Sequence, residues 1–169
     1  MNYCYKCGAE LTQKECFNCG ISDGIFPYCE SCGEFRFPFF NVAVSSVIFN
    51  KDYSKILLIQ QYGRPFNILV AGYVNKTETL EHALVREIQE EVNLKVKDFK
   101  FNESSYFEKS NSLICNFIVC VENENFELTQ EVDSAHWFTV QNAMKEVKEN
   151  SLAEYFLNKA VKKLNLLKQ

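Results

Sequence analysis

The sequence lacks the features that mark membrane proteins, secreted proteins and disordered chains. No stretch of its 169 residues approaches the roughly 20 consecutive apolar residues that a membrane-spanning helix needs. The start, Met1–Cys4, carries neither the basic residues nor the apolar run of a signal peptide, so we expect a cytoplasmic protein. Hydrophobic residues make up 47% and charged residues 24%, which is the composition of a folded globular protein.

An excess of positive charge is also absent. The formal net charge is -4, so no overall basic field attracts nucleic acid or an anionic membrane. The cysteine-rich residues 1–38 carry three basic and five acidic side chains, whereas a module that binds phosphate should be basic. A zinc-dependent nucleic-acid factor is therefore the least favoured alternative, and strongly salt-dependent binding would be its signature.

The chain changes character near residues 33–41. Cysteine, glycine and turn residues dominate before this point, and patterns of strand and helix alternate after it. We therefore expect a small domain over residues 1–38 and an α/β domain, with helices packed on a mixed sheet, over residues 39–169. The predicted strands are residues 41–50, 55–61, 67–71, 98–107, 112–121 and 135–140, and the predicted helices are residues 79–93 and 151–167.

One predicted helix carries three glutamates on a single face. Glu87, Glu90 and Glu91 stand at positions i, i+3 and i+4, where like charges repel one another. A divalent cation such as Mg²⁺ prefers carboxylate oxygen and would remove that repulsion. The alternative is an ordinary acidic face in solvent. An apolar stripe on the other side of the helix would hold the carboxylate face against the sheet; it comprises Ala83, Leu84, Ile88 and Val92.

The neighbours of these glutamates favour a metal site over an acidic surface. Gly72 ends a predicted strand and opens a loop in which the backbone can approach a ligand closely. Glu78 stands at the start of the helix. Arg86 lies beside the carboxylates and can pair with Glu78 or Glu90, which would orient them.

Residues 72–94 read GYVNKTETLEHALVREIQEEVNL and resemble the Nudix box, Gly-x5-Glu-x7-Arg-Glu-U-x-Glu-Glu-x-Gly-U, in which U is apolar. The only departure is Asn93, and asparagine is the usual second choice for the left-handed residue that ends a helix. The resemblance implies the Nudix α/β/α sandwich and the hydrolysis of a nucleoside diphosphate linked to another moiety. It also implies site residues. Mg²⁺ or Mn²⁺ would be bound by Glu87, Glu90 and Glu91, Glu87 would also be a candidate base, and Glu78 and Arg86 would support them.

A second segment, EVDSAHWF at residues 131–138, resembles one that follows the box in many Nudix proteins. That resemblance implies that Glu131 supplies a further metal ligand or the base. The alternative is an ordinary loop carboxylate. We expect Trp137 and Phe138 to be core residues, and we give His136 no catalytic role.

Three Cys-x-x-Cys-Gly segments lie in the first 33 residues and provide six candidate zinc ligands: Cys4, Cys7, Cys16, Cys19, Cys29 and Cys32. A structural zinc takes four ligands. The short spacing between the first two pairs, typical of small zinc ribbons, favours the set Cys4, Cys7, Cys16 and Cys19. The third pair resembles the ribbon that precedes the Nudix domain in NAD(H) diphosphatases, so it stays an alternative, as does a disulfide or redox role. We expect the ribbon to stabilise the fold or to form a dimer contact.

A zinc ribbon followed by a Nudix domain resembles the NAD(H) diphosphatase branch, and by that resemblance we expect a homodimer. The branch usually has Ser-Gln-Pro-Trp-Pro-Phe-Pro after the box, whereas residues 104–110 read SSYFEKS. The substrate signature of that branch is absent, so the sequence does not single out NAD(H). From the resemblance as a whole we expect a small nucleotide-type substrate such as NAD(H), ADP-ribose or a related dinucleotide. The predicted substrate contacts are Arg64, Gly72, Tyr73 and Tyr106. The alternative function is a non-catalytic nucleotide sensor or scaffold.

Overall fold

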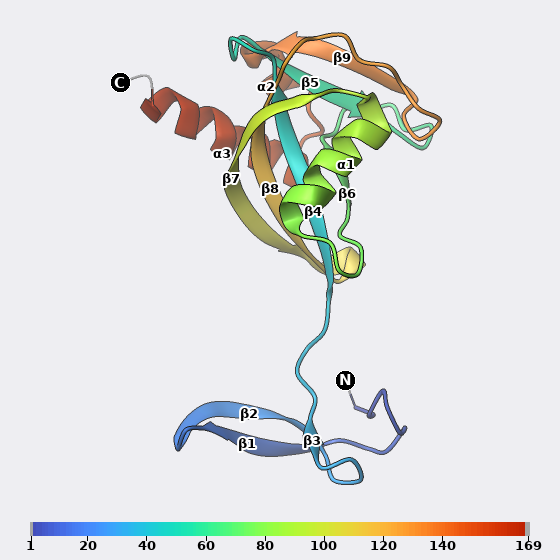
Figure 1. Cartoon of the computed structure of the whole chain (residues 1–169), viewed down its shortest axis with the longest axis vertical. Coiled ribbons are helices and arrows are strands. Elements are labelled where there is room, and N and C mark those ends of the chain that lie inside the picture. Colours follow the sequence, from blue (N-terminus) through green and yellow to red (C-terminus); the bar gives the residue numbers. More distant parts are fainter. Residues whose placement is uncertain (1, 168–169) are drawn as a thin grey trace. The chain divides into compact units, whose positions relative to one another are not determined.

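The computed structural model describes residues 2–167, and the chain divides into two compact units, Met1–Phe40 and Asn41–Gln169 (Figure 1). Each unit has its own sheet. Among the described residues, no helix has the length and apolar character that crossing a membrane would require.

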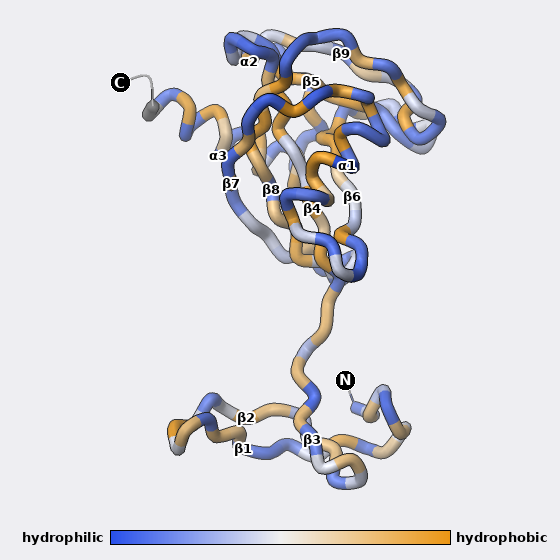
Figure 2. The backbone as a smooth tube through the Cα atoms, in the orientation of Figure 1, coloured by the Kyte–Doolittle hydropathy of each residue, from blue (hydrophilic) through white to orange (hydrophobic). Residues whose placement is uncertain are grey.

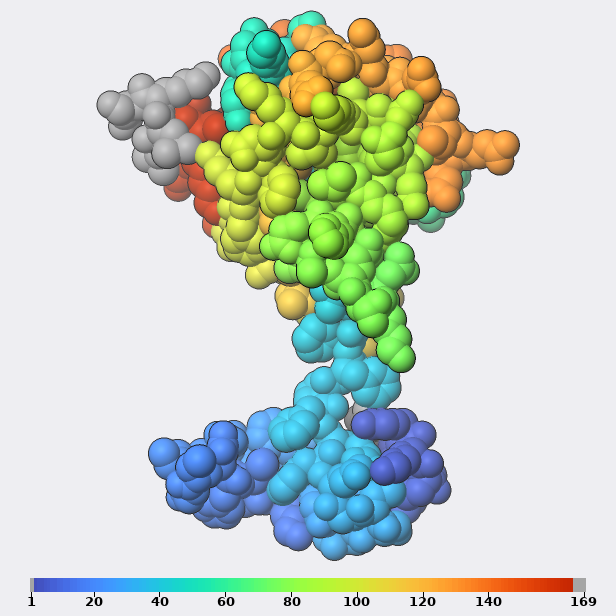
Figure 3. All heavy atoms as spheres, viewed as in Figure 1, coloured from blue at the N-terminus to red at the C-terminus, as the bar shows by residue number. Residues whose placement is uncertain are grey.

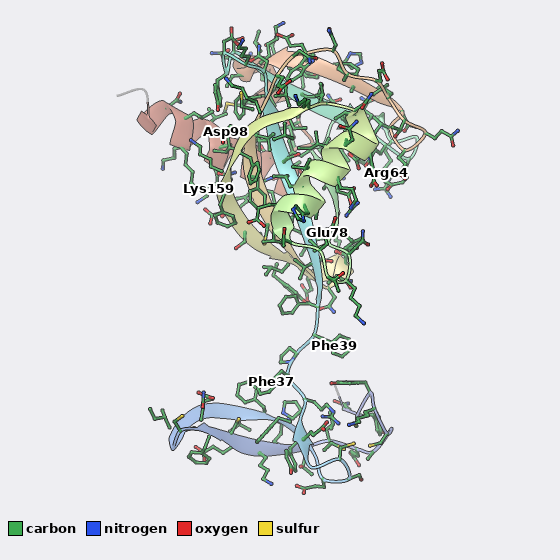
Figure 4. All side chains as sticks on the ribbon, viewed as in Figure 1. Phe37, Phe39, Arg64, Glu78, Asp98 and Lys159 are labelled. Carbon is green, nitrogen blue, oxygen red and sulfur yellow. The ribbon has the colours of Figure 1, made fainter. Side chains whose placement is uncertain are left out.

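The first unit is a three-stranded antiparallel sheet in the order β1-β2-β3, with β1 at Thr12–Asn18, β2 at Ile21–Cys29 and β3 at Glu34–Phe35. Among the described residues of this unit, those that are buried are Cys4, Cys29 and Arg36, so the unit has almost no apolar core. Large apolar side chains are instead exposed, among them Phe37 and Phe39 (Figure 4). So small a unit needs a metal, a disulfide or a partner to be stable.

The second unit contains a mixed six-stranded sheet. Its main order is β7-β8-β4-β5-β9, and β6 pairs with the first half of β4 while β5 pairs with its end. Only the β4–β8 pairing is parallel. The strands are β4 (Asn41–Phe49), β5 (Lys55–Gln60), β6 (Val70–Tyr73), β7 (Val96–Phe107), β8 (Ser112–Val121) and β9 (Ser134–Thr139).

Helices cover both faces of this sheet. Helix α1 (Leu80–Val92) packs its predicted apolar stripe into one buried cluster, and α2 (Val140–Glu146) and α3 (Leu152–Leu167) pack into a second. The central strands β4 and β8 run between the two clusters as mostly hydrophobic segments (Figure 2). The predicted α/β/α sandwich around a mixed sheet is confirmed.

The ends of helix α1 are set by the residues that flank it. The Thr79 side chain accepts a hydrogen bond from the backbone N–H of His82 and caps the first turn. Asn93 adopts the left-handed conformation, with φ 51°, so asparagine does take the place of glycine at the end of the helix.

In the second unit one helix was missed and one strand was misplaced, and none of the strands of the first unit was predicted from the sequence. Helix α2 was not predicted; it spans seven residues and buries one of them, Ala143, so its sequence has little periodicity to detect. Strand β6 begins at Val70 and not at Asn67, which places Gly72 inside the strand.

Candidate functional site

The glutamate face of α1 is largely buried. The exposed fraction is 9% for Glu87 and 3% for Glu91, whereas Glu90 is exposed. Helix α1 and the loop before it are green in Figure 3 and lie at the surface of this unit. The carboxylate of Glu87 lies against Gly72 of β6 and that of Glu91 accepts from Gln61 after β5, so both point between the helix and the sheet. An ordinary acidic face in solvent is thereby excluded, because solvated carboxylates have no reason to be buried.

Strand β6 makes room for Glu87 at one position. A Cβ atom added to Gly72 would overlap the carboxylate of Glu87. The φ angle of Gly72 is not positive, so it is space and not backbone conformation that requires glycine. We predicted that the backbone at Gly72 would approach a ligand, and the structure shows that it approaches a side chain of the site.

Arg86 connects the acidic residues. Its Nε and Nη2 donate to the two carboxylate oxygens of Glu78 at 2.8 and 2.9 Å, and its Nη1 donates to Glu87 at 2.6 Å and to Glu90 at 2.9 Å. The predicted pairing of Arg86 with Glu78 and Glu90 is confirmed. These bonds hold the pKa of Glu78 at about 2. A cation that binds Glu87 and Glu90 must compete with this guanidinium.

Glu91 is the most deeply buried carboxylate of the site. Its Oε1 accepts a hydrogen bond of 2.8 Å from Nε2 of Gln61, and its buried Oε2 has no hydrogen-bond partner. Burial raises the pKa of Glu91 to about 8, and the charges of Glu87 and Glu131 add to the effect. A buried oxygen without a partner is costly. A divalent cation would satisfy it, because hard cations bind carboxylate oxygen, so these residues fit the implied metal.

Glu131 lies in the loop before β9 and is exposed. Burial raises the pKa of both Glu87 and Glu91, and the charge of Glu131 adds to the rise, so its carboxylate lies within electrostatic range of both. The loop is bonded to the turn after β5 through Asp133, which accepts a 2.6 Å hydrogen bond from the N–H of Gly63. The role of Glu131 as ligand or base stays a prediction.

The three aromatic and basic substrate candidates are all exposed. Tyr73 contributes its backbone carbonyl to Arg86 at 2.9 Å. Arg64 lies in the turn after β5, with its guanidinium 5.9 Å from the ring centre of Tyr62 (Figure 4). Tyr106 lies near the end of β7 and donates its hydroxyl proton to Asn111. Their contact with a substrate stays a prediction.

The first unit contains a compact group of sulfur atoms. The Sγ atoms of Cys4, Cys7, Cys29 and Cys32 all lie within 4.8 Å of one another. Two of the sulfur–sulfur distances are 3.9 and 3.5 Å. Four thiolates placed tetrahedrally around zinc at about 2.3 Å would be separated by about 3.8 Å. Among residues 2–167 this is the one set of three or more ligand atoms that lies so close together.

This group corrects the predicted zinc set, because the third cysteine pair replaces the second. The N–H of Gly8 donates to the carbonyl of Cys4, and that of Gly33 to the carbonyl of Cys29, both at 2.8 Å, so the first and third pairs form equivalent knuckles. They converge because one precedes the β1–β2 hairpin and the other follows it.

The second pair lies in the β1–β2 hairpin instead, with Cys16 in β1 and Cys19 in the turn. Asn18 pairs with Ile21, and the two residues between them, Cys19 and Gly20, have φ angles of 50° and 82°. Positive φ at both positions is characteristic of a two-residue type I′ turn. In this segment the Cys-Gly of the Cys-x-x-Cys-Gly pattern forms a hairpin turn and not a zinc knuckle. Cys16 and Cys19 are therefore not part of the sulfur group.

One buried side chain, Arg36, bonds directly to the sulfur group. Burial acts to raise the pKa of the Cys4 thiol, but hydrogen bonds, chiefly from Nε of Arg36 at 3.2 Å, outweigh it and lower the pKa to about 6. The neighbouring thiols raise the pKa of Cys32 to about 12. Four crowded sulfur atoms resist simultaneous ionisation, and a bound cation relieves that conflict. The residues therefore fit a zinc ion.

Comparison with known proteins agrees with this geometry. A family model described as NUDIX domain matches residues 39–159. The chain is similar to the NAD-capped RNA hydrolase NudC of Pseudomonas fluorescens (strain Pf0-1), with 24% identity over 166 residues that cover 92% of this chain and 54% of that protein. It is also similar to the protein of the same name from Photorhabdus laumondii, with 29% identity over 140 residues that cover 80% and 51%. The chain spans about half the length of these curated relatives.

Two solved structures share the fold. A NUDIX hydrolase from Nitrosomonas europaea aligns with a TM-score of 0.67 and 18% identity, covering 98% of this chain and 93% of that one. The NUDIX domain of Shewanella oneidensis NrtR, crystallised with ADP ribose, aligns with a TM-score of 0.63 and 17% identity, covering 81% and 94%.

Proposed function

The chain belongs to the NUDIX domain family, and on that premise we propose that it hydrolyses a phosphoanhydride bond in an NAD-like substrate with the help of Mg²⁺ or Mn²⁺. The observation that carries the proposal is the buried Oε2 of Glu91, which has no hydrogen-bond partner. A buried oxygen without a partner is costly in a structural role, whereas a bound divalent cation would satisfy it.

The chain's own residues would divide the work by their surroundings. Glu91 and Glu87, both buried, would hold the cation, and Glu90 and Glu131 would complete its carboxylate ligands from the exposed side. A cation held there would neutralise charge on the diphosphate and lower the pKa of the attacking water. Arg86 would keep Glu87 and Glu90 oriented, since one of its nitrogens bonds to both. Glu87 or Glu131 would accept the proton of the water.

The substrate class rests on the relatives. Two of them are named NAD-capped RNA hydrolases, and a structural neighbour was crystallised with ADP ribose. The NAD cap and ADP ribose that these names mention both contain an adenosine joined to a second ribose through a diphosphate. Exposed Tyr73 and Tyr106 offer rings on which a base could stack, and Arg64 offers a cation for phosphate.

A turnover screen tests the proposal. NADH, NAD, ADP-ribose, diadenosine polyphosphates, dNTPs and NAD-capped RNA would be incubated with the full chain and Mg²⁺ or Mn²⁺, and the products identified by mass spectrometry. We expect a nucleoside monophosphate, or a 5′-monophosphate RNA, that requires the cation and is not formed by the Glu91→Gln variant. Tight nucleotide binding with no turnover of any substrate would favour a sensor and refute the proposal.

We infer further that the first unit binds one zinc ion through Cys4, Cys7, Cys29 and Cys32. The unit has almost no apolar core, and its sulfur atoms have the spacing of a tetrahedral site. Zinc here would supply folding free energy and take no part in hydrolysis. Metal analysis of the purified chain should find one equivalent of zinc.

A further inference from the structure

The amide of Gln61 occupies an unusual position for a neutral side chain. It lies one residue beyond the end of β5 and is only 7% exposed. Its Nε2 donates to Oε1 of Glu91 at 2.8 Å, and this is a hydrogen bond between two buried side chains from separate elements. A buried amide that faces a buried carboxylate fixes the orientation of that carboxylate.

We propose that Gln61 is a positioning residue for the metal ligand Glu91, an inference that rests on the proposed function. By holding Oε1, the amide leaves Oε2 as the oxygen that is offered to the cation. Glu91 then binds through one oxygen in a set orientation. Groups that orient a ligand in this way change metal affinity or activity by about 10- to 100-fold when they are removed.

Backbone hydrogen bonds fix the position of the turn that carries Gln61. The carbonyl of Gln61 accepts from the N–H of Arg64 at 3.2 Å, and the N–H of Gly63 donates to Asp133 at 2.6 Å. The backbone N–H of Asp133 in turn donates to the carbonyl of Gln60 at 2.8 Å. These hydrogen bonds join the turn that carries Gln61 to the loop that carries Glu131. The position of the Gln61 amide relative to Glu131 is therefore fixed.

The neighbouring Gln60 is a matched control. Gln60 is half-buried, whereas Gln61 is buried. Gln60 makes two side-chain hydrogen bonds, with Asn67 and Ser134, both at 3.1 Å. It does not bond to Glu91. Leucine at either position has a volume close to that of glutamine and no donor, so Gln61→Leu and Gln60→Leu remove comparable polar contacts from one strand end.

Calorimetric titration of the full chain with Mn²⁺ tests the proposal without relying on turnover. We expect Gln61→Leu to weaken Mn²⁺ binding by about 10- to 100-fold, and Gln60→Leu to leave it unchanged. Raising Mn²⁺ should restore turnover in Gln61→Leu with the substrate KM unchanged, and should fail to restore it in Glu91→Gln. Should Gln61→Leu not fold, Gln61→Met serves the same comparison.

Equal Mn²⁺ affinity in wild type and Gln61→Leu, or an equal loss in Gln60→Leu, overturns the proposal. These outcomes differ from failure of the proposed function. A wild-type chain that binds Mn²⁺ but hydrolyses no nucleotide refutes the function, and the affinities of the two leucine variants still decide the role of Gln61.

Discussion

Replacing Glu91 by glutamine should stabilise the protein while abolishing its activity. The substitution keeps the side-chain shape and an oxygen that can accept from Gln61, and it removes a buried acid. In the absence of a divalent cation this acid has a pKa of about 8, raised chiefly by burial from the ordinary 4.5. Folding must therefore protonate a group that is ionised in the unfolded chain at neutral pH.

The magnitude follows from the two pKa values. Since the folded pKa lies above the unfolded one, the penalty is absent below pH 4.5, grows as pH rises, and levels off near pH 8. At 1.36 kcal/mol for each pH unit, it amounts to roughly 3 kcal/mol at pH 7 and less than about 1 kcal/mol at pH 5. For a protein of this size, roughly 3 kcal/mol corresponds to a rise of about 10 °C in Tm at pH 7.

Thermal unfolding of both proteins in Mg²⁺-free buffer, from pH 5 to pH 8, measures this difference. The buffer should contain no strong chelator, which would also take a cation from the four cysteines. Glu90→Gln is the control, because the same change at an exposed position should alter stability by no more than about 0.5–1 kcal/mol. Added Mg²⁺ should stabilise the wild type and not Glu91→Gln, so the difference in Tm between the two proteins should become smaller.

The reasoning is refuted if Glu91→Gln melts below the wild type at pH 7 in Mg²⁺-free buffer. A difference in Tm that does not grow between pH 5 and pH 7 would also contradict the reasoning, since the titration of Glu91 would then not be the source of that difference.

Three other predictions follow from the structure. Gly72→Ala should cost about 1–3 kcal/mol of stability and about 100-fold in turnover, because the added methyl displaces the carboxylate of Glu87; urea unfolding and initial rates check this, and unchanged rates would contradict it. Cys32→Ser should lose the zinc and unfold the first unit, whereas Cys19→Ser should keep both, as measured by metal analysis and circular dichroism; zinc loss in Cys19→Ser would restore the ligand set favoured from the sequence. The pKa of Glu78 is lowered to about 2, so its ion pair stabilises the fold above pH 4.5 and less as pH falls toward 2; Glu78→Gln should flatten that part of the Tm–pH curve, and parallel curves would contradict this.

The sequence predicted those parts of the fold that have strong local signals. The helix at Leu80–Val92 was predicted within one residue at each end, because its apolar stripe is regular and its caps are recognisable. Strand Ser112–Val121 was predicted at its observed bounds. The short helix Val140–Glu146 carried no such signal, since Ala143 is its one buried residue.

The sulfur group could not be assigned from the sequence, because its ligands are chosen by long-range topology. All three cysteine pairs have the same local pattern, and only the pairing of the hairpin shows which two pairs meet. One signal was available. Cys19-Gly20 lies between two strand-like segments, and a residue–Gly pair in that setting is typical of a two-residue hairpin turn.

The hydrogen bond from Gln61 to Glu91 could not be predicted for a related reason. A glutamine at the end of a predicted strand is an ordinary surface residue by composition, and nothing local indicates that a helix thirty positions later will bury its carboxylate there.

The contact between Gly72 and Glu87 also limits how this chain can vary in length. Strand β6 pairs Gly72 with Val44, and its neighbours on either side are Ala71 and Tyr73, which both carry a Cβ. If β6 shifted by one residue against β4, a side chain would occupy the space that the carboxylate of Glu87 now fills. The contact with Glu87 in α1 therefore favours the observed register of β6. An insertion or deletion within β6 should therefore displace the carboxylate of Glu87 from its place beside Gly72.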